Sequence, residues 1–432
     1  MSETLLDQLV SVPGAGLPSV CSAHPVVLEE TVRHAAETDR VVLVEATCNQ
    51  VNQEGGYTGQ RPADFARQVR AYADRHGLAP DRLLLGGDHL GPNPWRHLPA
   101  ADALARSEAM VAEYVAAGFT KLHLDTSMTC ADDAPGPLAP ETIAERAARL
   151  AGVAESVAGR STPPGAESAA LLRYVVGTEV PVPGGEAAGE HGIHVSTAAD
   201  VGHTLEVSRA ALAAAGVPDA WSRVRAVVAQ PGVEFSHSEL FEYLPGQAAH
   251  LGGCLPDGMV FEAHSTDYQT CAALGALTAD RFAVLKVGPG LTFAYREAMY
   301  ALAAIEDELC GPRSSGLRRV VDEVMVADPG HWQAFYPAEP TAAAYARSWS
   351  RSDRVRYYWP RPEVERAVAR LLANLDRTGL PAELSSQFLP WLVADEAPGV
   401  DVGRLRPGDV PRAAVRRVLD VYARATPQPW AW

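Results

Sequence analysis

The stretch RLLLGGDH at residues 82–89 shows the pattern that decides the fold. Its apolar residues follow one another without polar alternation, which is typical of a strand buried on both faces in a parallel sheet. The stretch ends in an acidic residue and a histidine, and a longer amphipathic segment follows it. Short runs of this kind, each followed by such a segment, recur along the chain. They occupy residues 19–24, 40–49, 82–89, 121–127, 173–180, 223–232, 259–265 and 283–289.

The segments between these runs are predicted to be helices. Prolines such as Pro25 and Pro62 stand near helix starts, and glycines such as Gly77 and Gly118 follow helix ends. Eight alternating strand and helix units predict an α/β protein with a closed (β/α)8 barrel of the TIM type. The alternative is an open, doubly wound sheet. The predicted helices are 25–37, 62–76, 101–117, 140–157, 197–215, 238–251, 267–279 and 293–310.

The composition excludes several classes of protein. Of the 432 residues, 47% are hydrophobic, which is enough for one very large core or several ordinary ones and excludes general disorder. The 37 basic residues are outnumbered by 53 acidic ones, which gives a net charge of −16 without any Lys/Arg-rich tract. We therefore expect no nucleic acid and no anionic membrane as a partner.

Cysteines and the first residues bear on the compartment. Six cysteines without a CxxC pair argue against a disulfide framework or a zinc ribbon. Glu3 and Asp7 stand where a signal peptide would carry cations, and no apolar stretch approaches the roughly 20 residues of a membrane span. We therefore expect a cytoplasmic protein.

The strand pattern stops after Cys310, where the composition turns to Arg, Ala, Trp and Tyr with several proline breaks. We predict that residues 1–310 form the barrel and that residues 311–432 form a helical C-terminal extension packed on it. Within the extension, SDRVRYYWP at residues 352–360 combines two cations with three aromatic residues. Its simplest interpretation is a docking segment whose aromatic side chains are buried against the barrel.

Polar residues gather where the predicted strands end. Because parallel strands of a barrel all finish on one face, these residues must share one mouth. Burying an ionisable group costs several kcal/mol unless it is paired or metal-bound, so chemistry is the economical explanation for the cluster. The residues are Ser22, His24, Glu45, Thr47, Asn49, Gln50, Asp88, His89, Asp125, Ser127, Glu179, Gln230, Glu234, His237, Glu262, His264, Ser265 and Lys286.

Three histidines at this mouth predict a metal centre. His89, His237 and His264 end the third, sixth and seventh strands, and three imidazoles commonly hold a divalent metal with positions left open. Each histidine alone would be interpreted as a solvated or hydrogen-bonded core residue. His24, His97 and His123 stay open as further ligands, and a structural role is the alternative for His123. A site built on Cys21 or other cysteine thiolates near the mouth ranks lower, because cysteine is commonly a small buried hydrophobe.

Carboxylates surround the predicted metal. Asp88 precedes His89, and Glu45, Asp125 and Glu179 lie at neighbouring strand ends. A carboxylate in such a place takes a hydroxyl proton from a metal-bound substrate, or it orients the imidazoles. Both roles stay open for Asp125 and Glu179.

Turns near the mouth predict substrate contacts. In barrels, the loops after strands seven and eight often hold a phosphate through backbone N–H groups at a helix N-terminus. No GxGxxG fingerprint, Walker A sequence or GxSxG elbow is present. Glycine-rich turns occur at residues 183–185 and 288–290. The predicted substrate-binding residues are His24, Asn49, Gln50, Ser265, Thr266, Asp267, Lys286 and Gly288, with Arg354 and Arg356 reaching over the mouth to a distal phosphate.

Long motifs along nearly the whole chain carry a family resemblance. They include VCSAHP at 20–25, EATCNQVNQEGGYTG at 45–59, GGDHLGPN at 86–93, QPGVEFSH at 230–237, FEAHSTDYQT at 261–270 and DRVRYYWP at 353–360. The sequence resembles the Z-type tagatose-bisphosphate aldolase subunits (GatZ/KbaZ), which are related to class II metal-dependent aldolases. The resemblance implies either a supporting subunit of a separate catalytic aldolase or a ketohexose-6-phosphate 4-epimerase.

The resemblance to class II aldolases also assigns roles. It implies a catalytic Asp88, the metal ligands His89, His237 and His264, and a further carboxylate at Glu179. It implies a divalent metal, zinc first, with manganese, cobalt or nickel as alternatives. The segment HSTDYQT at 264–270 departs from the glycine-rich HGGSG pattern of the aldolase phosphate loop.

Sugar chemistry links the two implied reactions. In a 2-ketose the carbonyl acidifies the proton on C3 but not the one on C4, so inverting C4 requires cleavage between C3 and C4. Metal polarisation of the C2 carbonyl, with Asp88 or a neighbour accepting the C4 hydroxyl proton, provides that cleavage. Release of the fragments makes an aldolase of tagatose 1,6-bisphosphate, whereas re-addition to the other aldehyde face interconverts fructose 6-phosphate and tagatose 6-phosphate. The alternative is a non-catalytic subunit with an aldolase partner, and homo-oligomerisation stays open.

Overall fold

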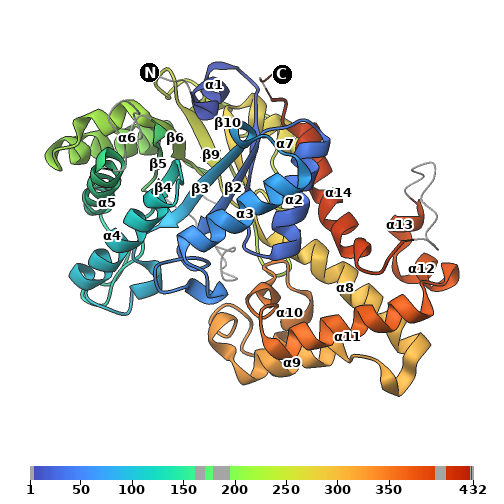
Figure 1. Cartoon of the computed structure of the whole chain (residues 1–432). Coiled ribbons are helices and arrows are strands. Elements are labelled where there is room, and N and C mark those ends of the chain that lie inside the picture. Colours follow the sequence, from blue (N-terminus) through green and yellow to red (C-terminus); the bar gives the residue numbers. More distant parts are fainter. Residues whose placement is uncertain (1–3, 161–170, 179–194, 395–404, 429, 431–432) are drawn as a thin grey trace.

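The computed structural model describes residues 4–160, 171–178, 195–394, 405–428 and 430. Eight parallel strands close into a barrel, in the order β1-β10-β9-β6-β5-β4-β3-β2 (Figure 1). Each predicted strand run overlaps one barrel strand, so the (β/α)8 prediction is confirmed and the open sheet is excluded. The strands are β1 (Leu17–Cys21), β2 (Val42–Thr47), β3 (Leu83–Leu90), β4 (Lys121–Leu124), β5 (Arg173–Val176), β6 (Val224–Val228), β9 (Val260–Ala263) and β10 (Phe282–Val287).

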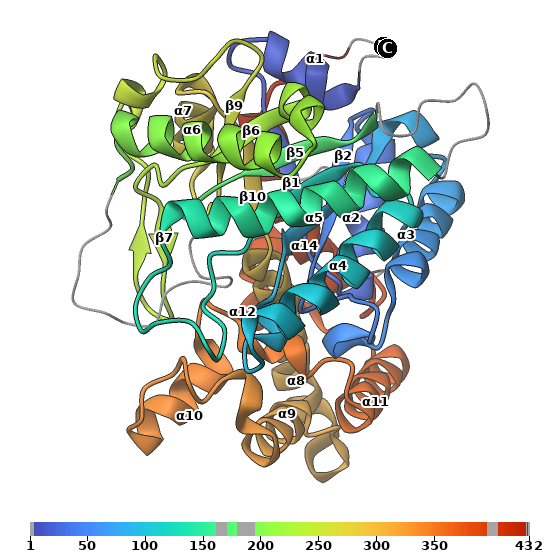
Figure 2. The same cartoon turned by 90° about the vertical axis from the view of Figure 1, so that its left-hand side faces the viewer.

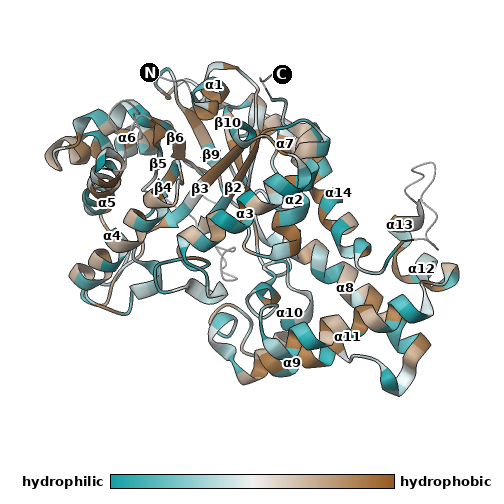
Figure 3. Ribbon diagram, viewed as in Figure 1, coloured by the Kyte–Doolittle hydropathy of each residue, from teal (hydrophilic) through white to brown (hydrophobic). Residues whose placement is uncertain are grey.

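Helices surround the barrel as the sequence predicts, with one exception. Two of them match the predicted bounds to the residue, because proline at the first helical position sets their starts. Figure 3 shows the strands in hydrophobic colours inside the mixed colours of these amphipathic helices. The helices are α2 (Pro25–Glu37), α3 (Pro62–His76), α4 (Ala100–Ala116), α5 (Pro140–Arg160), α6 (Ala198–Ala214), α7 (Cys271–Ala279) and α8 (Pro289–Cys310).

The exception is the segment 238–251, for which the prediction of a helix is wrong. The chain there forms an antiparallel pair, β7 (Glu234–Phe235) with β8 (Leu240–Phe241), and later a 3-10 turn at Ala249–Leu251. Pro245 cannot donate a helical hydrogen bond, and Gly246 adopts the left-handed region with φ 81°. Both residues interrupt a helix in the middle of the predicted segment.

The amino end of the barrel is closed by a helix that the sequence analysis missed. Helix α1 (Leu5–Ser11) lies across that end, at the top of Figure 1. Its Leu6 and Leu9 are buried in an apolar cluster with inward residues of the strands, among them Leu43 and Leu84. This end of the barrel is therefore filled by side chains.

Helices follow the last strand as well. Figures 1 and 2 show α9, α10 and α11 at the end of the barrel opposite α1, while α14 returns to the barrel wall beside α2, α7 and α8. The division into domains at residue 310 stays a prediction. In the described part of the chain no helix is long and apolar enough to cross a membrane. The helices are α9 (Leu317–Ala327), α10 (Pro340–Trp349), α11 (Pro362–Thr378), α12 (Ala382–Phe388), α13 (Pro390–Ala394) and α14 (Asp409–Ala425).

Strand register brings polar residues to one level at the carboxyl end. Cys21 of β1 lies opposite Glu45 of β2, and Ser19 of β1 lies opposite Lys286 of β10. Since all eight strands run in the same direction, the polar residues near their carboxyl ends face one shared mouth.

Candidate active site at the carboxyl end of the barrel

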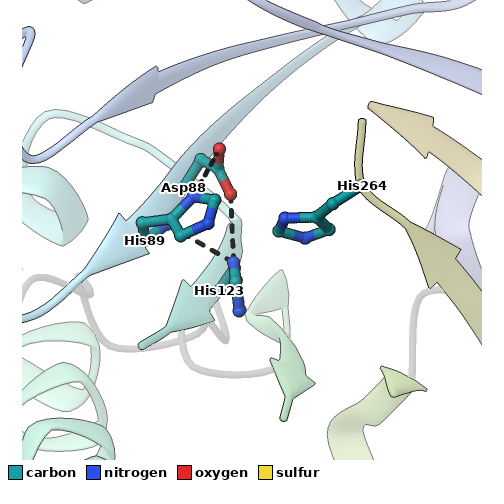
Figure 4. Close-up of side chains that lie close together, drawn as sticks. All are labelled: Asp88, His89, His123 and His264. Atoms are coloured by element: carbon teal, nitrogen blue, oxygen red, sulfur yellow. Dashed lines mark hydrogen bonds and ion pairs between the residues drawn. The ribbon is translucent and has the colours of Figure 1, made fainter. Parts of the chain in front are cut away.

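Four buried side chains meet at the mouth and form what we call the His–Asp cluster: Asp88, His89, His123 and His264 (Figure 4). Each offers a potential ligand atom, and these atoms all lie within 4.8 Å of one another. The ring centroid of His89 lies 4.9 Å from that of His123 and 4.8 Å from that of His264. Three imidazoles and one carboxylate from β3, β4 and the end of β9 therefore converge.

An irregularity in β3 lets two consecutive residues join the cluster. Successive residues of a regular strand point to opposite faces of the sheet. The pairing of β3 with β4 shifts register between Gly87 and Leu90, and His89 has a left-handed backbone with φ 47°. That conformation is uncommon for a residue with a side chain, and such strain often accompanies functional sites. The shift explains why Asp88 and His89 both reach the cluster.

Asp88 connects the histidines. Its carboxylate oxygens lie 2.9 Å from His89 Nδ1 and 3.0 Å from His123 Nδ1. Burial would raise the pKa of Asp88, but the two histidines outweigh it and hold that pKa well below the usual value. Burial would likewise lower the pKa of His89, but Asp88 outweighs it and raises that pKa to about 9. A metal ion at His89 therefore competes with a proton.

A buried ion network lies next to the cluster. Lys121 Nζ lies 2.6 Å from both Glu45 Oε1 and Glu262 Oε2. Lys286 Nζ pairs with Glu45 and lies 2.7 Å from Asp88 Oδ1. Although burial raises the pKa of Glu262, Lys121 and His264 bring it down to about 2. When a metal ion displaces the proton of His89 and the imidazoles are neutral, the carboxylates of Glu45, Asp88 and Glu262 face two ammonium groups and leave one negative charge in excess.

The cluster fits a divalent cation. Nε2 of His89 and Nε2 of His123 are buried without a hydrogen-bond partner. Leaving buried polar atoms unpaired costs about 1–3 kcal/mol each, and a bound ion would remove that cost. Imidazole and carboxylate donors suit zinc, and also manganese, cobalt or nickel. The excess negative charge beside the cluster favours a cation as well.

His123 stands in the cluster where the sequence analysis placed His237. Among the described residues, His237 belongs to no group of close potential ligands. It is half-buried between β7 and β8, and its carbonyl accepts a hydrogen bond from the Arg351 N–H at 3.1 Å. The prediction of His237 as a ligand is therefore not met by this geometry.

A cavity that is open to solvent lies over the cluster. Most of the predicted catalytic and substrate-binding residues line it. Cys21, whose thiol lies 3.2 Å from Asp88 Oδ2, also lines the cavity, as do Tyr57 and Tyr357, neither of which was predicted as a site residue. The predicted residues on its wall are Asn49, Gln50, Asp88, His89, His264, Ser265, Asp267, Lys286, Gly288 and Arg356.

A second cavity adjoins the first and has His24 on its wall. The His24 ring centroid lies 4.2 Å from that of Tyr295 and 6.2 Å from that of Trp359. Burial lowers the pKa of His24 to about 3, so its ring is neutral. The two cavities share Gln50 and Arg356 among their walls. His24 is therefore next to the candidate site and not over the cluster.

Several predicted residues lie elsewhere. Arg354 does not line either cavity, because its guanidinium donates to the His331 carbonyl and lies over the Phe335 ring. Thr266 donates to the Lys286 carbonyl from a fully buried position. Asp125 accepts from the backbone and hydroxyl of Ser127, at 2.9 and 2.6 Å.

Further predicted positions are placed as follows. Glu179 and the turn at residues 183–185 lie outside the described residues. Glu45 is fully buried in the ion network and does not line the cavity. Tyr358 and Trp359 of the docking segment are buried, and Tyr357 is partly buried.

Lys121 was not predicted as part of the site, His123 stayed open between a ligand and a structural role, and Glu262 was placed among the polar residues of the mouth without a role of its own. A signal existed in KLHL, the residues of β4, where a lysine and a histidine two positions apart alternate with leucines. Residues i and i+2 of a strand share a face, so these two polar residues must face the barrel interior together. An ion pair or a ligand is then needed to bury them.

The fold is an eight-stranded parallel barrel, and its carboxyl end holds a buried cluster of imidazoles and a carboxylate. These two features define a class of barrel proteins whose site suits a metal ion. Residues 4–427 match the family model of D-tagatose-1,6-bisphosphate aldolase subunit GatZ/KbaZ-like proteins. The chain belongs to this family, as its resemblance predicts.

Individual relatives support the assignment. The D-tagatose-1,6-bisphosphate aldolase subunit GatZ of Salmonella paratyphi B is 50% identical over 377 residues, which cover 87% of this chain and 88% of that protein. The subunit of the same name from Klebsiella pneumoniae shows the same identity and coverage. A crystal structure of a probable tagatose 6 phosphate kinase from Sinorhizobium meliloti 1021 is 46% identical with a TM-score of 0.84, covering 95% of this chain and all of that one. These names point to different reactions, so the reaction must be argued from the site.

Proposed function

We propose that this chain is a metal-dependent enzyme of phosphorylated ketohexoses that breaks and re-forms the bond between C3 and C4. The observation that carries the proposal is the His–Asp cluster, which has two imidazole nitrogens without a hydrogen-bond partner and three members, Asp88, His89 and His264, on the wall of an open cavity. Relatives named as tagatose-bisphosphate aldolase subunits support the sugar class. The reaction is interconversion of fructose 6-phosphate and tagatose 6-phosphate, or cleavage of tagatose 1,6-bisphosphate.

Three imidazoles, those of His89, His123 and His264, would hold the ion, with the Asp88 carboxylate beside it. Zinc is the first choice for this donor set. When bound, the ion polarises the C2 carbonyl of the ketose and so favours withdrawal of electrons from the C3–C4 bond.

Asp88 is the proposed base. It is ionised, it lines the cavity, and it accepts the proton of the C4 hydroxyl as the C3–C4 bond breaks. The bonding electron pair passes to C3 and the C2 carbonyl, and C4 becomes an aldehyde. Re-addition to the other face of that aldehyde returns the proton from Asp88 and gives the C4 epimer. Lys286, 2.7 Å from Asp88 Oδ1, fixes the carboxylate, and Glu45 in turn holds both Lys286 and Lys121.

The test uses the purified chain without any partner protein. We expect it to convert fructose 6-phosphate to tagatose 6-phosphate, or to cleave tagatose 1,6-bisphosphate, and to lose this activity with a chelator. Restoring the activity by adding back zinc, manganese, cobalt or nickel one at a time identifies the metal. Turnover that a chelator leaves unchanged contradicts the proposal.

A second candidate function is favoured by the word subunit in the names of the relatives. In that case the chain binds and stabilises a separate class II aldolase without catalysing a reaction. No turnover of either sugar, together with stable co-elution of the chain with such an aldolase in size-exclusion chromatography, would establish this second function in place of the first.

A further inference from the structure

The N-terminus of α8 at the cavity wall is filled by a side chain of the protein itself. Asp267 Oδ1 accepts hydrogen bonds from the Gly288 N–H at 2.9 Å and from the Gly290 N–H at 2.7 Å. A Cβ atom at Gly290 would lie 2.9 Å from this oxygen, so glycine permits the close approach. Asp267 is only 2% exposed and lines the cavity. The carboxylate is therefore a built-in part of the wall.

The position of Asp267 is one at which β/α barrels often bind a phosphate. The loops after the seventh and eighth strands, with a helix N-terminus, often bind a phosphate through free backbone N–H groups. Here β9 and β10 are the seventh and eighth barrel strands, and α8 follows β10 directly. The two N–H groups that a phosphate would use already donate to Asp267.

We infer that Asp267 is a specificity-determining residue that occupies the place of a phosphate and excludes one from this end of the cavity. The inference rests on the proposed function and narrows its substrate class. A bisphosphate would bring a second anion against a buried carboxylate and find its N–H donors taken, and both effects weaken binding. The preferred ketose therefore carries an uncharged hydroxymethyl group against Asp267 and a single phosphate at the opposite end of the sugar.

Arg356 is the group that receives the single phosphate. It lies on the walls of both cavities, and its guanidinium donates to the Asp353 carbonyl at 3.0 Å and to the Tyr357 hydroxyl at 3.1 Å. The other cation of the first cavity wall, Lys286, is ion-paired with Glu45 and Asp88. Within the described ranges no ion pair joins Arg356 directly to a carboxylate, although Asp267 and Asp353 lie near enough to attract its charge.

The test compares wild type with Asp267→Ala, which frees the two N–H groups, and with Asp267→Asn, which removes the charge but keeps an oxygen on them. The measurement is the ratio of kcat/KM for fructose 6-phosphate to kcat/KM for tagatose 1,6-bisphosphate. We expect wild type to favour the monophosphate by about tenfold or more. Asp267→Ala should lower this ratio about tenfold, and Asp267→Asn should lower it by a smaller factor.

A second readout does not depend on turnover. Inorganic phosphate should raise the melting temperature of Asp267→Ala more than that of wild type, and Asp267→Asn should behave like wild type because its amide oxygen still covers the N–H groups. Equal phosphate responses of wild type and Asp267→Ala, or a wild type that prefers the bisphosphate, would overturn the inference. If Asp267→Ala does not fold, an unchanged ratio in Asp267→Asn overturns it. If neither sugar is turned over by wild type, the proposed function fails, and the phosphate response still decides the role of Asp267.

Discussion

The two ends of the barrel bury charge in different ways. At the amino end, Asp7 of α1 accepts hydrogen bonds from Arg173 Nε at 2.8 Å, from Arg225 Nε at 2.5 Å and from the Thr4 N–H at 2.8 Å. At the carboxyl end, the His–Asp cluster and its ion network leave Nε2 of His89 and of His123 without a partner. The Asp7 carboxylate therefore has several donors, whereas two imidazole nitrogens of the cluster have no hydrogen-bond partner.

This difference separates structural from functional charge. A folded chain pairs almost all of its buried polar groups, because an unpaired one costs free energy. The paired carboxylate of Asp7 is explained by holding α1 against the strands. The unpaired imidazoles have no such explanation, and they indicate a ligand that the protein is built to bind.

The largest expected effect comes from the cluster itself. His123→Ala should remove bound zinc and lower kcat/KM by more than about a thousandfold, because a ligand is lost together with the contact to Asp88. The matched control is His237→Ala, which should keep both metal and activity, since His237 lies outside the cluster. Metal content of the purified variants and steady-state kinetics are the measurements. The opposite pattern, with metal lost in His237→Ala alone, would restore the prediction made from the sequence.

The next effect concerns the ion network. Lys121→Met leaves the buried carboxylates of Glu45 and Glu262 without their shared ammonium, and breaking a buried pair in this way costs about 3–5 kcal/mol. The free energy of unfolding in urea measures the loss. The control is Arg319→Met, which removes an exposed pair with Glu323 and should change stability by less than about 0.5 kcal/mol. If the free energy of unfolding falls as little in Lys121→Met as in Arg319→Met, the ion network does not stabilise the fold.

A smaller effect is expected at the amino end. Burial would raise the pKa of Asp7, but hydrogen bonds from Arg173, Arg225 and Thr4 outweigh it and hold that pKa well below its usual value. The carboxylate therefore adds stability at pH values above the ordinary carboxyl pKa, and this stability is lost as the pH falls toward the folded-state pKa. Asp7→Asn should cost about 1–3 kcal/mol at pH 7 and less at pH 3.

Denaturation of wild type and Asp7→Asn at the two pH values measures that difference. A stability gap of equal size at pH 7 and pH 3 would contradict the assigned role of the Asp7 charge. Metal content and activity at pH 7 should be unchanged, because Asp7 lies at the far end of the barrel from the cluster.

The smallest effect separates two arginines of the docking segment. Arg356→Ala should raise KM for fructose 6-phosphate about tenfold, with a smaller change in KM for unphosphorylated fructose, because it removes a phosphate contact. Arg354→Ala should leave both KM values nearly unchanged and lower the melting temperature, since Arg354 packs on Phe335 and donates to a carbonyl. Equal rises of KM for both sugars in Arg356→Ala would indicate that this residue only positions the segment.

The sequence predicted most of the fold because local signals set the barrel elements. Continuous apolar runs marked the eight strands, and proline with glycine marked the bounds of α2 and α3. The signal failed at residues 238–251, where Pro245 and Gly246 outweigh the helical composition around them. Helix α1 was missed because its contacts lie with strands far along the chain.

The sequence by itself determined the barrel, the family and the set of polar residues that could reach its mouth, because the alternation of strands and helices and the long motifs are local properties of the chain. The tertiary structure decided which of them meet. The register shift in β3 and the left-handed backbone of His89 bring both Asp88 and His89 to the cluster, where His123 of β4 joins them in place of His237. The approach of two loops puts Asp267 on the N-terminus of α8, and the packing of the docking segment turns Arg356 toward the cavity and Arg354 away from it. These outcomes depend on register, backbone conformation and contacts between distant segments, none of which a local pattern contains.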